Sequence, residues 1–138
     1  MLFRSGLQLL FTTSEEFGTH NGLDIISGTV KKFPNINDKN KAIKVPQIAW
    51  NQLLLAKQSW KKTPFTHLKP GDYAYFVHSF YVIPEKDDVI LSMTDYSGFE
   101  YCYSVLKDNV FAVQFHPEKS THKGLEIYEH WSKLHKLF

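Results

Sequence analysis

Apolar residues recur at helical intervals near both ends of the chain. Leu7, Leu10 and Phe11 are spaced by three and one positions, which predicts an amphipathic helix over residues 6–17. Residues 121–138 show the same periodicity, and we predict a second helix there. Its apolar stripe consists of Ile127, Trp131, Leu134 and Phe138.

The middle of the chain is rich in β-branched and aromatic residues, which favour strands. We predict a polar loop over residues 34–40, a short helix over 51–57 and a tight turn at 108–109. The order of elements is therefore helix, several strands, helix, which is typical of an α/β or α+β domain. The predicted strands cover residues 22–33, 44–50, 73–84, 89–94, 101–106 and 110–115.

Composition narrows the class of protein. The 138 residues are 43% hydrophobic and 22% charged, which predicts one ordered globular domain over residues 1–138. A net charge of +2 is too small to indicate a nucleic-acid partner. The apolar runs are too short for a membrane-spanning helix. A single cysteine, Cys102, excludes an intrachain disulfide framework and fits a reducing cytoplasm.

No cofactor and no metal site is expected from the sequence. The best candidate ligands for a metal are His130 and His135 in the last predicted helix. A separation of five residues does not bring two side chains onto one helix face. A solvated helix surface is the simpler interpretation of this pair.

The sharpest chemical feature is the junction between the last strand and the last helix. There the sequence runs Val-Gln-Phe-His-Pro-Glu-Lys-Ser over residues 113–120. If the backbone stays extended through Pro117, His116 and Glu118 point to the same side. A carboxylate in that place can fix the tautomer of the imidazole and stabilise its protonated form, as in a nucleophilic triad. Alternatively, His116 is a strand-end histidine beside a solvated glutamate that caps the helix, and spacing alone leaves both readings open.

Residues 114–120 resemble the closing motif of the class I glutamine amidotransferases. Four further segments resemble, in the same order, the glutaminase subunit of imidazole glycerol phosphate synthase; they are residues 6–11, 22–30, 46–51 and 75–81. The resemblance implies an α/β, flavodoxin-like layered domain, here without its N-terminal part. It also favours the catalytic reading of the histidine and the glutamate.

The resemblance implies a role for each matching residue. His116 corresponds to the triad base and Glu118 to its orienting carboxylate. Gln8 matches a residue that helps to hold the substrate glutamine, and Ser79 and Phe80 match a segment whose backbone lies along that glutamine.

A protein partner is implied by the same resemblance. Pro46, Trp50 and Asn51 match the face that meets the cyclase subunit, a (β/α)₈ barrel, in a heterodimer. In this family, ammonia released from glutamine passes through the barrel to a nucleotide-derived substrate of histidine biosynthesis.

The nucleophile is where the chain departs from the family. Class I enzymes carry Gly-x-Cys-x-Gly-x-Gln, and alignment on Gly6 and Gln8 places Arg4 in the cysteine position. A guanidinium keeps its proton and cannot attack an amide carbon. Cys102 lies in an alternating strand and Ser5 one position beyond the nucleophile, so neither is expected to replace it.

Three functions remain open from the sequence. The first is a glutaminase subunit supplying ammonia to a cyclase, with a partial domain that is inactive as given. The second is a non-catalytic remnant that binds the barrel partner. The third is an ammonia-supplying subunit for the amidation of surface sugars.

Overall fold

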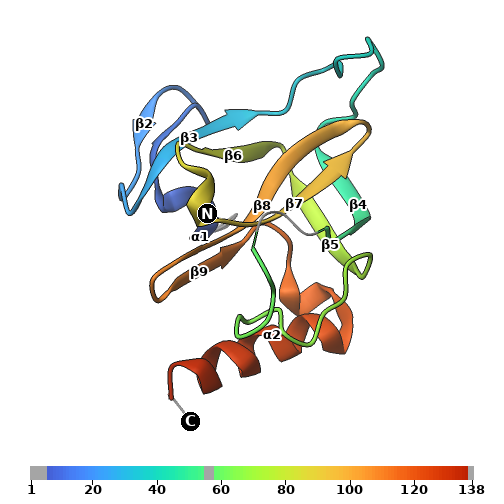
Figure 1. Ribbon diagram of the computed structural model, residues 1–138. Helices are drawn as coiled ribbons and strands as arrows, with labels where there is room; N and C mark the ends of the chain where they lie inside the picture. The colour runs from blue at the N-terminus through green and yellow to red at the C-terminus, as the bar shows by residue number, and fades with distance from the viewer. Residues whose placement is uncertain (1–5, 55–57, 137–138) are drawn as a thin grey trace.

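The computed structural model describes residues 6–54 and 58–136. Within these ranges seven strands form one mixed sheet in the order β2-β1-β3-β6-β8-β7, and β9 pairs with β8 on a separate branch (Figure 1). The strands of this sheet are β1 (Phe11–Ser14), β2 (His20–Asn21), β3 (Ile26–Lys32), β6 (Phe80–Pro84), β7 (Ile90–Tyr96), β8 (Phe99–Lys107) and β9 (Val110–Val113).

The pairing in the sheet is mostly antiparallel. Among the described strands, β1 and β3 form the one parallel pair. A second, two-stranded antiparallel sheet consists of β4 (Gln47–Gln52) and β5 (Tyr73–His78). Together with the helices, these sheets confirm the α/β fold class predicted from the sequence.

The first predicted helix is wrong beyond its first turn. Helix α1 spans only Gly6–Leu9, and the chain then enters β1. Thr12 and Thr13 are β-branched and favour an extended backbone. Phe11 pairs with Ile26 of β3, so contacts with a distant strand outweigh the local helical spacing.

The long strand predicted over residues 73–84 is two strands in different sheets. β5 ends at His78, β6 begins at Phe80, and Ser79 lies between them. The Ser79 carbonyl accepts the Phe33 N–H at 2.9 Å, and Phe80 then pairs with Lys32 of β3. The chain therefore crosses from the small sheet to the large one at Ser79.

The helix predicted over residues 51–57 is also wrong in its described part. Asn51 and Gln52 belong to β4, where they pair with Ala74 and Tyr73. Residues 55–57 lie outside the described part of the chain. The turn predicted at 108–109 is confirmed, since Lys107 pairs with Val110 around it.

Two apolar clusters pack on either side of β8. Tyr101 and Tyr103 face the cluster that includes Phe65, whereas Cys102 and Val105 face the cluster that includes Phe11. Burial on both faces explains why apolar and aromatic residues of β8 follow one another, as in Tyr101, Cys102 and Tyr103, rather than alternating with polar ones.

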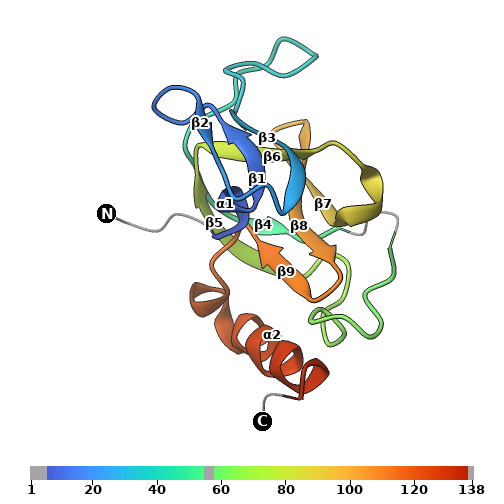
Figure 2. The ribbon, with the colours of Figure 1, turned by 90° about the vertical axis from the view of Figure 1, so that its left-hand side faces the viewer.

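Helix α2 (Thr121–Leu134) runs below the end of the sheet that carries β9 (Figure 2). It follows two short 3₁₀ turns along the chain, η1 (Asp87–Val89) and η2 (Pro117–Lys119). Ile127 is buried as predicted, but Leu134 is 46% exposed and so does not belong to the buried stripe. Residues 137–138, where the prediction had continued the helix, lie outside the described part. Over the described ranges, no helix is long and apolar enough to cross a membrane.

Candidate functional site

His116 and Glu118 form a hydrogen-bonded pair at the junction of β9 and α2. His116 Nδ1 lies 2.9 Å from Glu118 Oε1. The carboxylate oxygen accepts a hydrogen bond at this distance, so Nδ1 carries the hydrogen, and in that tautomer Nε2 holds the lone pair. The side chains are 30% and 50% exposed, which leaves the pair open to a ligand. The structure therefore brings together the two residues that the sequence singled out.

The backbone of this junction is held from two sides. The His116 N–H donates to the Tyr75 carbonyl of β5 at 3.0 Å. The Ser120 hydroxyl donates to the His116 carbonyl at 2.6 Å and accepts the Tyr75 N–H at 3.0 Å. Pro117 opens η2, where its fixed φ suits the first position of a helical turn. The orientation of the imidazole thus depends on contacts with β5, 41 residues earlier in the chain.

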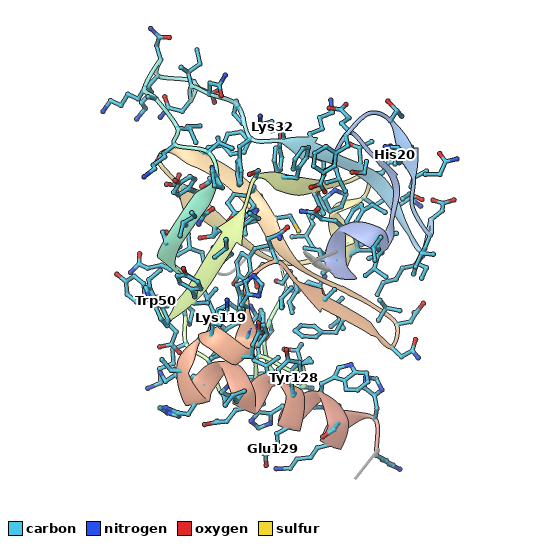
Figure 3. All side chains as sticks on the ribbon, turned by 180° about the vertical axis from the view of Figure 1, so that it is seen from behind. His20, Lys32, Trp50, Lys119, Tyr128 and Glu129 are labelled. Carbon is cyan, nitrogen blue, oxygen red and sulfur yellow. The ribbon has the colours of Figure 1, made fainter. Side chains whose placement is uncertain are left out.

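A cavity of about 570 Å³ lies beside the pair. Its walls come from the start of α1, from β9 and from the inner side of α2, and they include Gly6, Gln114, His116, Glu118 and Tyr128. Figure 3 shows Tyr128 on the side of α2 that faces β9, and Glu129 on the opposite side. A mostly apolar cavity with a few polar groups on one wall is the usual form of a small-molecule site.

Gln8 does not line this cavity but forms hydrogen bonds to two residues near it. Its Nε2 donates to the Phe80 carbonyl at 3.1 Å and to Gln114 Oε1 at 3.2 Å. Gln114 itself lines the cavity. The side-chain amide of Gln8 therefore joins α1 to Phe80 of β6 and to Gln114 at the end of β9. Ser79 directly precedes Phe80 in the chain.

His78 was not singled out from the sequence, although it lies inside the recognised segment 75–81. Its Nδ1 is 2.7 Å from the Phe80 carbonyl, and its Nε2 is 3.1 Å from the Tyr101 hydroxyl. Burial lowers the pKa of His78 to about 4, so the ring is neutral at pH 7. The neutral ring donates its Nδ1–H to the Phe80 carbonyl, to which Gln8 also donates, and both bonds hold the turn after Ser79.

Cys102 is not placed to serve as a nucleophile. It is buried in β8, where its thiol donates to the Ser104 carbonyl at 3.4 Å. Burial raises its pKa to about 12, which leaves almost no thiolate at pH 7. Within residues 6–54 and 58–136, the lining of the cavity contains no cysteine, serine or threonine. Arg4 and Ser5 lie outside the described residues.

The three residues matched to a partner face do not all point the same way. Trp50 is 49% exposed on the outer side of the small sheet (Figure 3), and Pro46 is exposed just before β4. Asn51 faces inward, where its Nδ2 donates to Thr94 Oγ1 at 3.1 Å and to the Asp95 carbonyl at 2.8 Å. Asn51 therefore fastens the small sheet to β7.

Comparison with known proteins identifies the family of the chain. The sequence profile of the class I glutamine amidotransferases matches residues 5–131. The chain belongs to the class I glutamine amidotransferase family. The mixed sheet of the structure is consistent with a domain of this family.

Several relatives of this amidotransferase chain carry the name imidazole glycerol phosphate synthase subunit HisH. The protein from Syntrophotalea carbinolica is 45% identical over 130 residues, which are 94% of this chain and 61% of the relative. The Aquifex aeolicus protein is 45% identical over 128 residues, 93% of this chain and 57% of the relative. The Pyrococcus furiosus protein is 41% identical over 129 residues, 94% of this chain and 61% of the relative. The chain thus spans about three fifths of the length of these relatives.

Proposed function

We propose that this chain forms the His–Glu part of a glutaminase site of the imidazole glycerol phosphate synthase type. The reaction of such a site is the hydrolysis of glutamine, with delivery of ammonia to a cyclase partner in the cytoplasm. The observation that carries this proposal is the 2.9 Å contact between His116 Nδ1 and Glu118 Oε1 at the wall of the cavity. HisH relatives at 41–45% identity support the same assignment.

Each residue of the pair has a distinct task in this proposal. Glu118 holds the Nδ1–H of His116, so that Nε2 presents its lone pair to the proton of a nucleophile. When the ring takes that proton, the adjacent carboxylate stabilises the imidazolium. Gln8 and His78 both bond to the Phe80 carbonyl and so position the strand that lies along the substrate glutamine.

The chain as given is proposed to be inactive in glutamine hydrolysis. Arg4 occupies the position of the nucleophilic cysteine, and an arginine side chain does not form a covalent thioester. Loss of the nucleophile removes most of the rate enhancement of a triad, of the order of 10⁴-fold or more.

Ammonia release from glutamine tests this inactivity. We expect no release above a protein-free blank, either from the chain or from its Arg4→Cys variant. The matched control is the double variant Arg4→Cys/His116→Ala. Release by the unsubstituted chain above the blank would refute the proposed inactivity. Release by Arg4→Cys above the double variant would refute only the expectation that cysteine alone does not restore hydrolysis, and it would support His116 as the base.

The tautomer of His116 tests the role of the pair independently of turnover. We expect ¹⁵N shifts of the neutral imidazole to show the hydrogen on Nδ1. In Glu118→Ala the acceptor is lost, so the ring should revert to the tautomer with its hydrogen on Nε2. A ring whose tautomer is the same in both proteins would contradict the orienting role of Glu118.

Binding of a barrel-type cyclase subunit is the second candidate function. It is favoured by an exposed apolar surface on the small sheet, formed by Ile48 and Trp50 of β4 and Tyr73 of β5; these are 57%, 49% and 58% exposed. The pairing of Trp50 with Tyr75 places this surface next to the strand that holds His116. A partner seated there would therefore lie beside the cavity.

Titration of the cyclase subunit against variants of the chain tests this surface. Trp50→Ala is expected to weaken binding by roughly 30-fold, as for a central aromatic side chain of an interface. The control is Leu125→Ala on α2, whose side chain is 53% exposed but lies on another element. Equal weakening by both variants, or by neither, would contradict the assignment of the β4–β5 surface.

A further inference from the structure

Three potential metal ligands meet where the loop between β4 and β5 touches α2. A ring nitrogen of His67, a carboxylate oxygen of Glu126 and a ring nitrogen of His130 all lie within 4.8 Å of one another. Glu126 and His130 are four residues apart on α2 and so share one face of the helix. Figure 1 shows the loop that carries His67 descending to this helix.

One ring nitrogen of His67 has no hydrogen-bond partner among the described residues. Its Nε2 lies 2.7 Å from the Lys123 carbonyl, which can only accept, so Nε2 carries the hydrogen. Nδ1 of the neutral ring is then a bare lone pair, and it is buried without a hydrogen-bond partner among the described residues. A histidine that donates one ring N–H to a backbone carbonyl and keeps the other nitrogen free has the arrangement of a metal ligand.

The other two residues are available for coordination. In the described part of the chain, Glu126 forms no ion pair and His130 forms no hydrogen bond. Both are half-buried. Neighbouring charges are already paired, because Lys123 bonds to Asp72 at 2.8 Å and Lys133 bonds to Glu129 at 2.7 Å. These two lysines therefore do not compete for the carboxylate of Glu126.

We propose that His67, Glu126 and His130 form a binding site for a divalent transition-metal ion, with Zn²⁺ as the preferred ion. Two imidazoles and one carboxylate are a common zinc ligand set, and they leave a fourth position for water. The ion would fasten the loop to the helix that borders the cavity of His116. The site is separate from the proposed glutaminase function and does not depend on it.

Metal binding requires one side chain to turn. In the structure the rings of His67 and His130 are stacked, with centroids 4.6 Å apart and planes 18° from parallel. An imidazole coordinates in its own plane, so two nearly parallel rings cannot meet at one ion. His67 is held by Lys123, and His130 therefore has to rotate out of the stack when the ion binds.

Titration of the tag-free full chain with Zn²⁺, and with Co²⁺ as a spectroscopic probe, tests the site. We expect saturable binding of one ion per chain, with visible Co²⁺ bands that differ from those of the hexaaqua ion. Glu126→Gln and His130→Gln should each weaken Zn²⁺ binding by about tenfold or more, because each removes a ligand. Zn²⁺ should raise the Tm of the unsubstituted chain and leave that of Glu126→Gln nearly unchanged.

Matched controls separate this site from other histidines. His122→Gln alters a neighbouring residue of α2 outside the cluster and should bind Zn²⁺ like the unsubstituted chain. His116→Gln should also retain binding; loss of binding in that variant would place the ion at the glutaminase pair and overturn the proposal. Absence of saturable binding, or equal affinity in Glu126→Gln and the unsubstituted chain, overturns it as well.

Discussion

Gly124 of α2 lies very close to η2. Replacing a helical glycine by alanine usually stabilises a protein, but at Gly124 the added methyl group should destabilise it. A Cβ at this position would lie 2.2 Å from the Pro117 carbonyl oxygen and 2.8 Å from Ser120 Cβ. Ordinary contacts begin near 3.4 Å, so the backbone of η2 has to move by about 1 Å. Overpacking of this kind costs about 1–3 kcal/mol, whereas alanine in place of glycine gains at most about 1 kcal/mol in a helix.

We therefore expect Gly124→Ala to lower the free energy of unfolding by about 1–2 kcal/mol, measured by urea denaturation. Because Pro117 lies between His116 and Glu118, the same displacement should lengthen their contact and change the ¹⁵N shifts of the His116 ring. Leu125→Ala, at an exposed neighbouring position, should change stability by less than about 0.5 kcal/mol. A Gly124→Ala variant that is as stable as the unsubstituted chain, or more stable, would refute the steric argument.

Three further results are expected. With a pKa near 12, Cys102 should react with iodoacetamide at pH 8 roughly a thousandfold more slowly in the folded chain than in urea, followed by mass spectrometry. The pKa of His78 lies near 4 when folded and at 6.5 in its ordinary state, so the unfolded chain binds the proton first as the pH falls. His78 therefore does not lower the free energy of unfolding well above pH 6.5, but its effect should reach about 2 kcal/mol by pH 5. The variant His78→Asn should show a smaller loss of stability over the same pH range. Asn51→Ala removes two hydrogen bonds to β7 and should lower the free energy of unfolding by about 1–2 kcal/mol in denaturation curves, whereas Ala49→Ser in the same strand should have a smaller effect.

The local sequence pattern was sufficient to predict contacts between residues that are close in the chain. The turn between β8 and β9 could be predicted, because the two strands of a hairpin are adjacent in the chain and the turn sets their register. The pairing of His116 with Glu118 could also be anticipated, since two positions separate them. For the same reason, Glu126 and His130 could have been recognised as one helix face, but His67 is 59 residues away from Glu126 and no spacing rule reaches it.

Tertiary contacts overrode local pattern at two places. Residues 11–14 have a partly helical spacing, but pairing with β3 satisfies their backbone groups and draws them into the sheet. The run 73–84 is uniformly strand-forming, but the bond from Phe33 to the Ser79 carbonyl divides it between two sheets. Intrinsic preferences are of the order of 1 kcal/mol or less per residue, so burial and pairing with distant strands decide such segments.

The sequence by itself determined the family, the α/β class and the two residues of the His–Glu pair, because these depend on collinear motifs and on spacing along the chain. The structure alone decided which groups surround them. Gln8 donates a hydrogen bond to the Phe80 carbonyl, 72 residues away in the chain, and His78 donates to the same carbonyl. Such convergence depends on how the two sheets and α2 pack together, and packing is a property of the whole fold rather than of any one segment.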